Sequence, residues 1–209
     1  LNDCDAAALG EDVFGAGREA SRTMYVTVGT GVGGGLIVNG VVDGASRPAM
    51  MEIGHVQIGP NGGTVEDMVS GLGLSARALA LAQAVTADSP HRSSAQQVLD
   101  AHAAALLDGK WLAARAIDHC PIAQETIRTG VEALGWALAS AATLVAPEVI
   151  VVGGGIASMP DPLFWPPLRR AFETNVFAPL KGHVRLSATA LGADSVVFGA
   201  VEAARRSNV

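Results

Sequence analysis

Short apolar runs and longer alanine-rich stretches follow one another along the chain, and this pattern predicts strands and helices in turn. The run VIVV at 149–152 is apolar throughout, as expected of a strand covered on both faces. The stretch 122–145 predicts a long helix that ends before Pro147, because the residue preceding a proline disfavours the helical conformation. The other predicted strands are 24–29, 36–42, 56–58 and 184–188, and the other predicted helices are 2–14, 71–87, 93–107, 163–177 and 198–206.

This order of elements indicates an α/β fold with a mixed sheet flanked by helices. Asn39-Gly40 interrupts the apolar residues of 36–42 and predicts a tight hairpin turn there. No linker, repeat or low-complexity block divides the chain, so residues 1–209 are expected to form a single domain. The apolar stretch 133–147 is shorter than the ~20 residues that a bilayer requires, and it therefore predicts a buried helix.

Composition and charge narrow the class of protein. Of the 209 residues, 49% are hydrophobic and 16% are charged, which argues against disorder. The net charge of -6 gives no general attraction for nucleic acid or an anionic membrane, so neither is expected as a partner. Cys4 and Cys120 form neither a disulfide framework nor a CxxC pair, which favours a reducing, cytoplasmic setting.

Two glycine-rich segments are candidates for phosphate binding. In VTVGTGVGGGL, residues 26–36, glycines and Thr30 are expected between two strands, where main-chain N–H groups and a hydroxyl can approach a phosphate. The segment lacks Gly-Lys-Ser/Thr and precedes no helix, so it is neither a P-loop nor a dinucleotide fingerprint. A plain glycine-rich β-hairpin is the alternative.

The second segment, Gly153-Gly154-Gly155, ends the buried run 149–152. Ligands of open α/β sheets bind at the carboxyl ends of the strands, so this position suits a ligand. A strand-to-helix turn that requires small residues explains the same glycines.

Carboxylates and a histidine gather in MEIGHVQIGPNGGTVEDMVSG, residues 51–71. Glu52, His55 and Glu66 flank a short loop of Gly, Pro and Asn. Such a group suits either a metal site or a polar ligand pocket. A packed histidine and solvated surface carboxylates are the structural alternatives.

An ordered set of motifs resembles the ROK family of sugar kinases and related repressors. The motifs are NDCDAAALGE, VTVGTGVGGGLIVNG, EIGH, the ExxxSG of EDMVSG, and APEVIVVGGGIA, and together they cover essentially the whole chain. The resemblance implies the actin/hexokinase-like, or ribonuclease H-like, ATPase fold. Family members begin with a smaller domain that carries an Asp-x-Gly-Gly-Thr phosphate loop. This chain has no such loop and resembles the large, C-terminal domain with the small domain missing.

The resemblance implies roles for particular residues. Asp3 would be the general base that takes the proton of the attacking sugar hydroxyl, although an Asp at this point also commonly caps a helix. Sugar hydroxyls would be bound by Asn2, Glu52, His55 and Glu66. ATP would be bound by Thr30, Gly31, Gly33, Gly153, Gly154 and Gly155. Mg²⁺ would accompany the nucleotide through phosphate oxygens and water, so the sequence assigns it no protein ligand.

One departure from the family concerns zinc. ROK proteins usually follow Gly-His with three cysteines that bind a structural zinc together with the histidine. Between His55 and Glu66 this chain has only VQIGPNGGTV, so no structural zinc is expected.

The sequence leaves three functional hypotheses open. The first is an ATP-dependent kinase of a hexose or N-acetylhexosamine, with this chain alone inactive because half of the phosphate cleft is missing. The second is a non-catalytic sugar-sensing domain, as in ROK repressors. The third is a degenerate or truncated product with neither activity. The resemblance also implies a homodimer.

Overall fold

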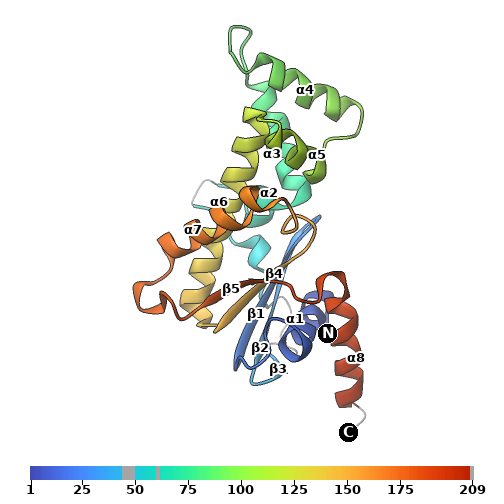
Figure 1. Cartoon of the computed structure of the whole chain (residues 1–209), viewed down its shortest axis with the longest axis vertical. Coiled ribbons are helices and arrows are strands. Elements are labelled where there is room, and N and C mark those ends of the chain that lie inside the picture. Colours follow the sequence, from blue (N-terminus) through green and yellow to red (C-terminus); the bar gives the residue numbers. More distant parts are fainter. Residues whose placement is uncertain (44–49, 60–61, 208–209) are drawn as a thin grey trace.

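The centre of the molecule is a mixed sheet with helices on both faces, seen in a computed structural model that describes residues 1–43, 50–59 and 62–207 (Figure 1). The strand order is β3-β2-β1-β4-β5. β2 is antiparallel to β1 and β3, whereas β4 is parallel to β1 and β5. The strands are β1 (Arg22–Val28), β2 (Val32–Val38), β3 (Val41–Val42), β4 (Val149–Gly153) and β5 (Arg185–Ala188). The predicted fold class is confirmed.

The glycine-rich segment differs from the prediction, because Gly33, Gly34 and Gly35 lie inside β2 rather than in a turn. Helix α1 (Asp3–Phe14) crosses this strand closely. A Cβ on Gly35 would lie 2.7 Å from the carbonyl oxygen of Cys4, nearer than a real packing contact. Glycine is needed here so that helix and strand can approach each other.

The predicted strand at 56–58 is also wrong. Within the described residues this stretch forms an isolated bridge between Gln57 and Thr64. Val56 is 40% exposed, so this short run has no buried apolar face that would hold it in the sheet as a strand.

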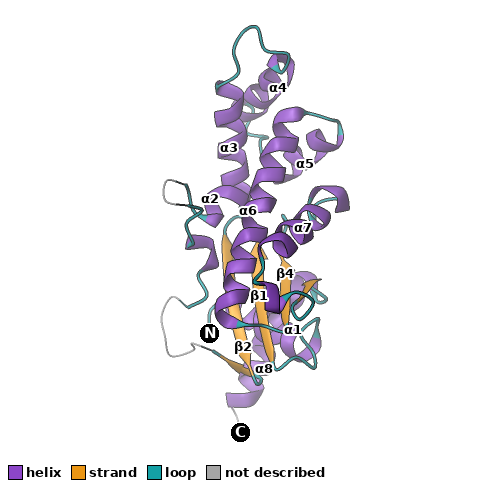
Figure 2. Ribbon diagram, turned by 90° about the vertical axis from the view of Figure 1, so that its left-hand side faces the viewer, coloured by secondary structure: helices purple, strands orange, loops and turns teal. Residues whose placement is uncertain are grey.

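Alternate residues of β1 face opposite sides of the sheet, as the strand period requires. Met24 and Val26 belong to the larger apolar core, and Tyr25 belongs to the smaller one. α1 and α8 (Ser195–Ser207) cover the side of the smaller core, while α6 (Pro121–Val145) lies across the other side (Figure 1, Figure 2). A Cβ on Gly199 of α8 would overlap the carbonyl oxygen of Ala6, so these two helices touch backbone to backbone.

Helices α3, α4 and α5 gather at one end of the molecule, beyond the strands (Figure 1, Figure 2). The sequence did not indicate α2 or α5, and α4 ends earlier than predicted. Ala105 adopts a φ of 57°, which stops the helical path. Asp108 then caps α5 by accepting the N–H of Trp111 at 2.7 Å. The remaining helices are α2 (Val65–Val69), α3 (Gly71–Gln83), α4 (Arg92–Ala103), α5 (Gly109–Ile117) and α7 (Trp165–Asn175).

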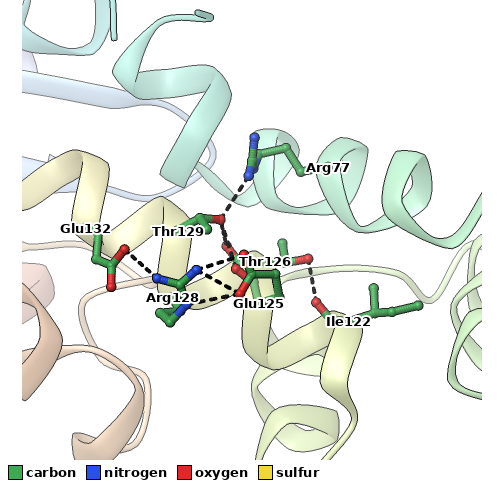
Figure 3. A network of polar contacts seen from close by, with 7 residues as sticks. All are labelled: Arg77, Ile122, Glu125, Thr126, Arg128, Thr129 and Glu132. Carbon is green, nitrogen blue, oxygen red and sulfur yellow. Dashed lines mark hydrogen bonds and ion pairs between the residues drawn. The ribbon is translucent and has the colours of Figure 1, made fainter. Parts of the chain in front are cut away.

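A polar contact ties α3 to α6 (Figure 3). The guanidinium of Arg77 donates to the hydroxyl of Thr129 at 2.9 Å. Along α6, Arg128 pairs with Glu125 at 2.8 Å and with Glu132 at 2.7 Å. Such exposed pairs within one helix each contribute about 0.3–0.5 kcal/mol. They reinforce α6, whereas the Arg77–Thr129 bond joins two helices.

No helix within the described residues is long and apolar enough to cross a membrane.

Candidate active site

Two glycine-rich turns meet at one edge of the sheet, because β1 and β4 are parallel and each turn follows a carboxyl end. Residues 29–31 follow β1, and Gly154 follows β4. The N–H of Ile156 donates to the carbonyl oxygen of Val28 at 2.9 Å and ties the second turn to the end of β1. Gly154 has a φ of 94°, and a Cβ there would overlap that same carbonyl oxygen. This is the edge at which α/β sheets bind ligands.

The start of α3 lies against the first turn. The N–H of Gly71 donates to the carbonyl oxygen of Gly29 at 2.8 Å, and the N–H of Gly29 donates to the carbonyl oxygen of Gly31 at 2.9 Å. Ser70 caps the helix by accepting the N–H of Gly73 at 3.0 Å. A helix N-terminus carries partial positive charge, so this turn favours an anion such as phosphate.

A cavity of about 760 Å³ opens between the two turns, the start of α3 and the helix α5. Its size suits a nucleotide or another small organic molecule. Thr30 and Gly155 line it, as do Asp108 and Lys110 at the start of α5. The cavity therefore combines a glycine turn, a hydroxyl and a cation.

The other predicted nucleotide residues lie around this cavity rather than on its wall. A Cβ on Gly31 would lie 2.6 Å from a carboxylate oxygen of Glu66, and a Cβ on Gly33 would lie 2.6 Å from the sulfur of Cys4. Gly153 and Gly154 line a neighbouring cavity of about 340 Å³.

The first turn of α1 holds the predicted base. Asn2 is the N-cap, and its side-chain oxygen accepts the N–H of Asp5 at 2.7 Å. Asp5 closes a capping box by accepting the N–H of Asn2 at 3.4 Å. Asp3 is exposed, and its carboxylate accepts the N–H of the adjacent Cys4 at 3.0 Å and also hydrogen-bonds the Cys4 thiol. The capping role thus falls to Asn2 and Asp5, which leaves the Asp3 carboxylate outside the helix cap.

Several carboxylates lie near the thiol of Cys4. Burial raises the pKa of Cys4 to about 12, with further contributions from Asp3, Glu52 and Asp5. The carboxylates of Asp3 and Glu52 therefore share the neighbourhood of one thiol, although they are far apart in sequence.

Two short helices carry the remaining predicted sugar residues. Glu52 and His55 lie on or beside η1 (Ile53–His55), and Glu66 lies in the first turn of α2. Both helices pack on the first residue of β2: the Glu66 carboxylate accepts the N–H of Val32 at 2.8 Å, and a Cβ on Gly54 would overlap the carbonyl oxygen of Val32.

His55 also lies near α2. The pKa of Asp67 is lowered first by hydrogen bonds from the backbone and side chain of Thr64, and to a smaller degree by His55. Glu66 and η1 thus lie against the first residue of β2, while Asp3 and Glu52 lie near the thiol of Cys4, which adjoins Gly33. Among the described residues, no three or more His, Cys, Asp or Glu side chains are grouped so as to hold a metal ion.

Lys110 and Asp108 line the candidate cavity, and the sequence motifs do not predict either residue as part of a site. Lys110 is one of two lysines in the chain. The sequence signal for α5 is Asp108-Gly109, a helix-capping residue followed by glycine. The Ala-rich stretch before it favours a longer α4, so the end of α4 and the start of α5 were not predicted.

The mixed sheet, its two glycine-rich turns and the cavity between them are those of the actin/hexokinase-like ATPase fold. The chain belongs to the ROK family, whose model matches residues 1–207.

Known relatives include kinases and a regulator. A glucokinase of Halalkalibacterium halodurans is 31% identical over 200 residues, which cover 95% of this chain and 60% of the glucokinase. A putative xylose repressor of Caldicellulosiruptor sp. is 26% identical over 208 residues, covering 96% of this chain and 50% of the repressor. The crystal structure of a ROK family glucokinase from Streptomyces griseus in complex with glucose and AMPPNP has a TM-score of 0.80 at 28% identity, covering 98% of this chain and 67% of that chain. This chain therefore spans about 60% of the length of the Halalkalibacterium glucokinase.

Proposed function

We propose that this chain is the large domain of a ROK-type sugar kinase, which transfers the γ-phosphoryl group of ATP to a hydroxyl of a hexose or N-acetylhexosamine. The observation that carries the proposal is the exposed Asp3 carboxylate, free of capping duty and gathered with Glu52 beside the strand that leaves the first glycine turn. The matched glucokinases extend beyond the region that this chain matches. We assign the other wall of the phosphate cleft to that additional part.

Transfer needs a proton acceptor at the attacking hydroxyl. The sugar oxygen bonds to the γ-phosphorus while its proton passes to the carboxylate of Asp3. The bond between the γ-phosphorus and the bridging oxygen breaks, and ADP leaves with that electron pair. An exposed carboxylate at the edge of the cleft can reach the hydroxyl without moving the capped helix behind it.

Sugar hydroxyls are bound by Asn2, Glu52, His55 and Glu66. One oxygen of Glu66 accepts the N–H of Val32, so the other is oriented by that bond to accept from a hydroxyl. A site made of such hydrogen bonds rejects analogues that lack the hydroxyl, because its polar groups would remain unpaired.

The nucleotide occupies the cavity between the two glycine turns. Thr30 contacts phosphate from the cavity wall with Gly31 next to it in the same turn, Gly155 supports the adenosine end with Gly153 and Gly154 next to it, and Lys110 supplies a positive charge. The lining fits such a ligand, since it combines a helix N-terminus, an exposed hydroxyl and a lysine. Mg²⁺ bound with ATP neutralises phosphate charge, and it is held by phosphate oxygens and water rather than by a cluster of side chains.

The second candidate is a sugar-sensing regulator without kinase activity, and the similarity to a putative xylose repressor supports it. A coupled assay of ADP release separates the two. The protein expressed from its full reading frame is supplied with ATP, Mg²⁺ and a panel of hexoses and N-acetylhexosamines. Sugar-dependent ADP release supports the kinase. Sugar binding by calorimetry without ADP release favours the regulator and refutes the kinase proposal.

A further inference from the structure

A second large cavity lies away from the glycine turns. It has a volume of about 790 Å³ and opens between the end of α7, the segment 176–184 and the start of β5. β4 and β5 are parallel, and this cavity adjoins Arg185 at the start of β5, whereas Gly154 follows the end of β4. The two cavities therefore lie at opposite ends of the strands, and this one belongs to no part of the site described above.

The walls of this cavity are strongly basic. Four cations line it, against the single carboxylate of Glu173, in a chain whose net charge is -6. None of the four forms an ion pair with another described residue. The cations are Arg169, Arg170, Lys181 and Arg185.

Two of the arginines are already positioned. The guanidinium of Arg185 donates to the carbonyl oxygen of Ala16 at 2.8 Å. That of Arg169 lies 5.4 Å from the centre of the Trp165 ring. Arg185 and Leu186 are successive residues of β5 and face opposite sides of the sheet. Leu186 belongs to the larger core and Ala16 packs against the smaller one, so the guanidinium of Arg185 faces away from the apolar floor of the cavity. The contact of Arg169 with Trp165 does not neutralise its charge, so that side chain is restrained and still able to bind an anion. A restrained guanidinium loses less entropy on binding than a free one.

The floor of the cavity is apolar. Phe172 and Val176 are buried, Leu186 is 9% exposed, and Val184 is half-buried at the mouth. A cavity with charged walls and an apolar floor suits a ligand with both an anionic group and an apolar body.

We propose that this cavity is a binding site for a small organic phosphate ester. Arg170 and Lys181 supply exposed positive charge to the phosphate, together with the restrained guanidinium group of Arg169. Arginine binds phosphate through two parallel N–H bonds, and such charge-assisted bonds are about twice as strong as neutral ones. The apolar floor holds the organic part of the ester.

Binding is measured by calorimetry and by tryptophan fluorescence, since an anion at Arg169 alters the cation above Trp165. The probes are phenyl phosphate and inorganic phosphate, at low and high salt. Phenyl phosphate is expected to bind at least about tenfold more tightly than inorganic phosphate and to weaken as salt screens the charges. The double variant R170E/K181E is expected to lose binding by more than about tenfold.

The matched control is R92E, which reverses an exposed charge at the start of α4, and it should bind as wild type does. Circular dichroism checks that each variant is folded. Equal binding by R170E/K181E and wild type, or no binding of phenyl phosphate, would each overturn the proposal. Should the double charge reversal fail to fold, the milder R170Q/K181Q is tested for the same loss.

Discussion

The carboxylate of Glu66 accepts the backbone N–H of Val32 at 2.8 Å, so a residue of α2 is fixed to the first residue of β2. A Cβ on Gly31 would lie 2.6 Å from the same carboxylate oxygen, and the turn before β2 therefore has to be free of a side chain. Glu66 is thus positioned by the protein backbone, in a segment where the family resemblance would otherwise suggest a zinc-bound loop.

Replacement of Glu66 by Ala should destabilise the protein by about 1 kcal/mol, because the N–H of Val32 loses its partner at a half-buried position. Glu66→Gln keeps a carbonyl oxygen there and should lose less. Urea denaturation followed by circular dichroism measures both. Glu52→Ala, at an exposed carboxylate, is the control and should stay within about 0.5 kcal/mol of wild type. An unchanged stability for Glu66→Ala would show that the bond does not hold α2.

Asp3→Asn should reduce turnover of the sugar kinase by at least about 100-fold, since an amide cannot take the hydroxyl proton. Its stability should be unchanged, because Asn2 and Asp5 cap α1. The measurement is steady-state kinetics on the protein expressed from its full reading frame. Asp5→Asn is the matched control: it makes the same change of charge two residues away and should keep most of the turnover. Wild-type turnover by Asp3→Asn would remove Asp3 from the role of base.

Local signals account for much of the agreement between sequence and structure. The run VIVV is fully apolar because β4 is buried on both faces. Asn39 and Gly40 form the turn between β2 and β3 with positive φ values, a conformation that Asn and Gly favour. The glycines of β2 were misplaced because their cause is tertiary: α1 approaches so closely that Gly35 can have no side chain. A single sequence contains no signal for such an approach.

In the candidate site, too, features with a local sequence signal were predicted and features that depend on tertiary structure were not. The glycine turns and the carboxylates of Asp3, Glu52 and Glu66 were found from motifs, because each lies in a short recognisable segment. Lys110 was not found, because α5 is far from those motifs in sequence and reaches the cavity only through folding. Convergence on the thiol of Cys4 is likewise a property of the folded chain.

Glu11 is a wholly buried carboxylate that joins α1 to the segment before α8. It accepts hydrogen bonds from the hydroxyl groups of two residues and the N–H groups of three, namely Thr189, Ser195, Ala16, Ala190 and Leu191. Burial acts to raise its pKa, but these hydrogen bonds outweigh burial and hold the pKa of Glu11 below its ordinary value of 4.5. Its contribution to stability is therefore complete above the unfolded-state pKa and is lost as pH falls through the lower, folded-state pKa.

Glu11→Gln should destabilise the protein by about 3 kcal/mol at neutral pH, since the new NH₂ group faces hydrogen-bond donors. The variant should also show a flatter dependence of stability on pH below about 4.5, because the titrating group is gone. Thermal denaturation across this range measures both effects. Glu132→Gln, in an exposed ion pair, is the control and should change stability by about 0.5 kcal/mol or less. The same pH dependence in Glu11→Gln and wild type would contradict the assignment.

Cys4 should react slowly with iodoacetamide at pH 8, because its pKa is raised to about 12 by burial and then by Asp3, and the thiolate is the reactive form. Asp3→Asn removes one negative charge beside the thiol, so it should lower that pKa and speed alkylation. Peptide mass spectrometry follows the rate at each cysteine, and the buried Cys120 serves as the internal reference. A slower reaction in Asp3→Asn would mean that the thiol and the Asp3 carboxylate are not neighbours.

Gly154→Ala should destabilise the protein through backbone strain and through steric overlap in the turn after β4. The matched variant Gly192→Ala measures the backbone strain alone. Gly154 has a φ of 94°, and its new Cβ would overlap the carbonyl oxygen of Val28. Gly192 also has a positive φ, of 58°, but has open space around it. Gly192→Ala should therefore cost about 1 kcal/mol from backbone strain alone. Gly154→Ala adds the overlap and should cost at least about 2 kcal/mol more, by analogy with overpacked cores.

Because the N–H of Ile156 donates to the carbonyl oxygen of Val28, Gly154→Ala should also weaken binding of an ATP analogue, whereas Gly192→Ala should not. Equal losses of stability in the two variants, measured by urea denaturation, would mean that the turn relaxes away from β1 and that close packing does not fix the nucleotide edge.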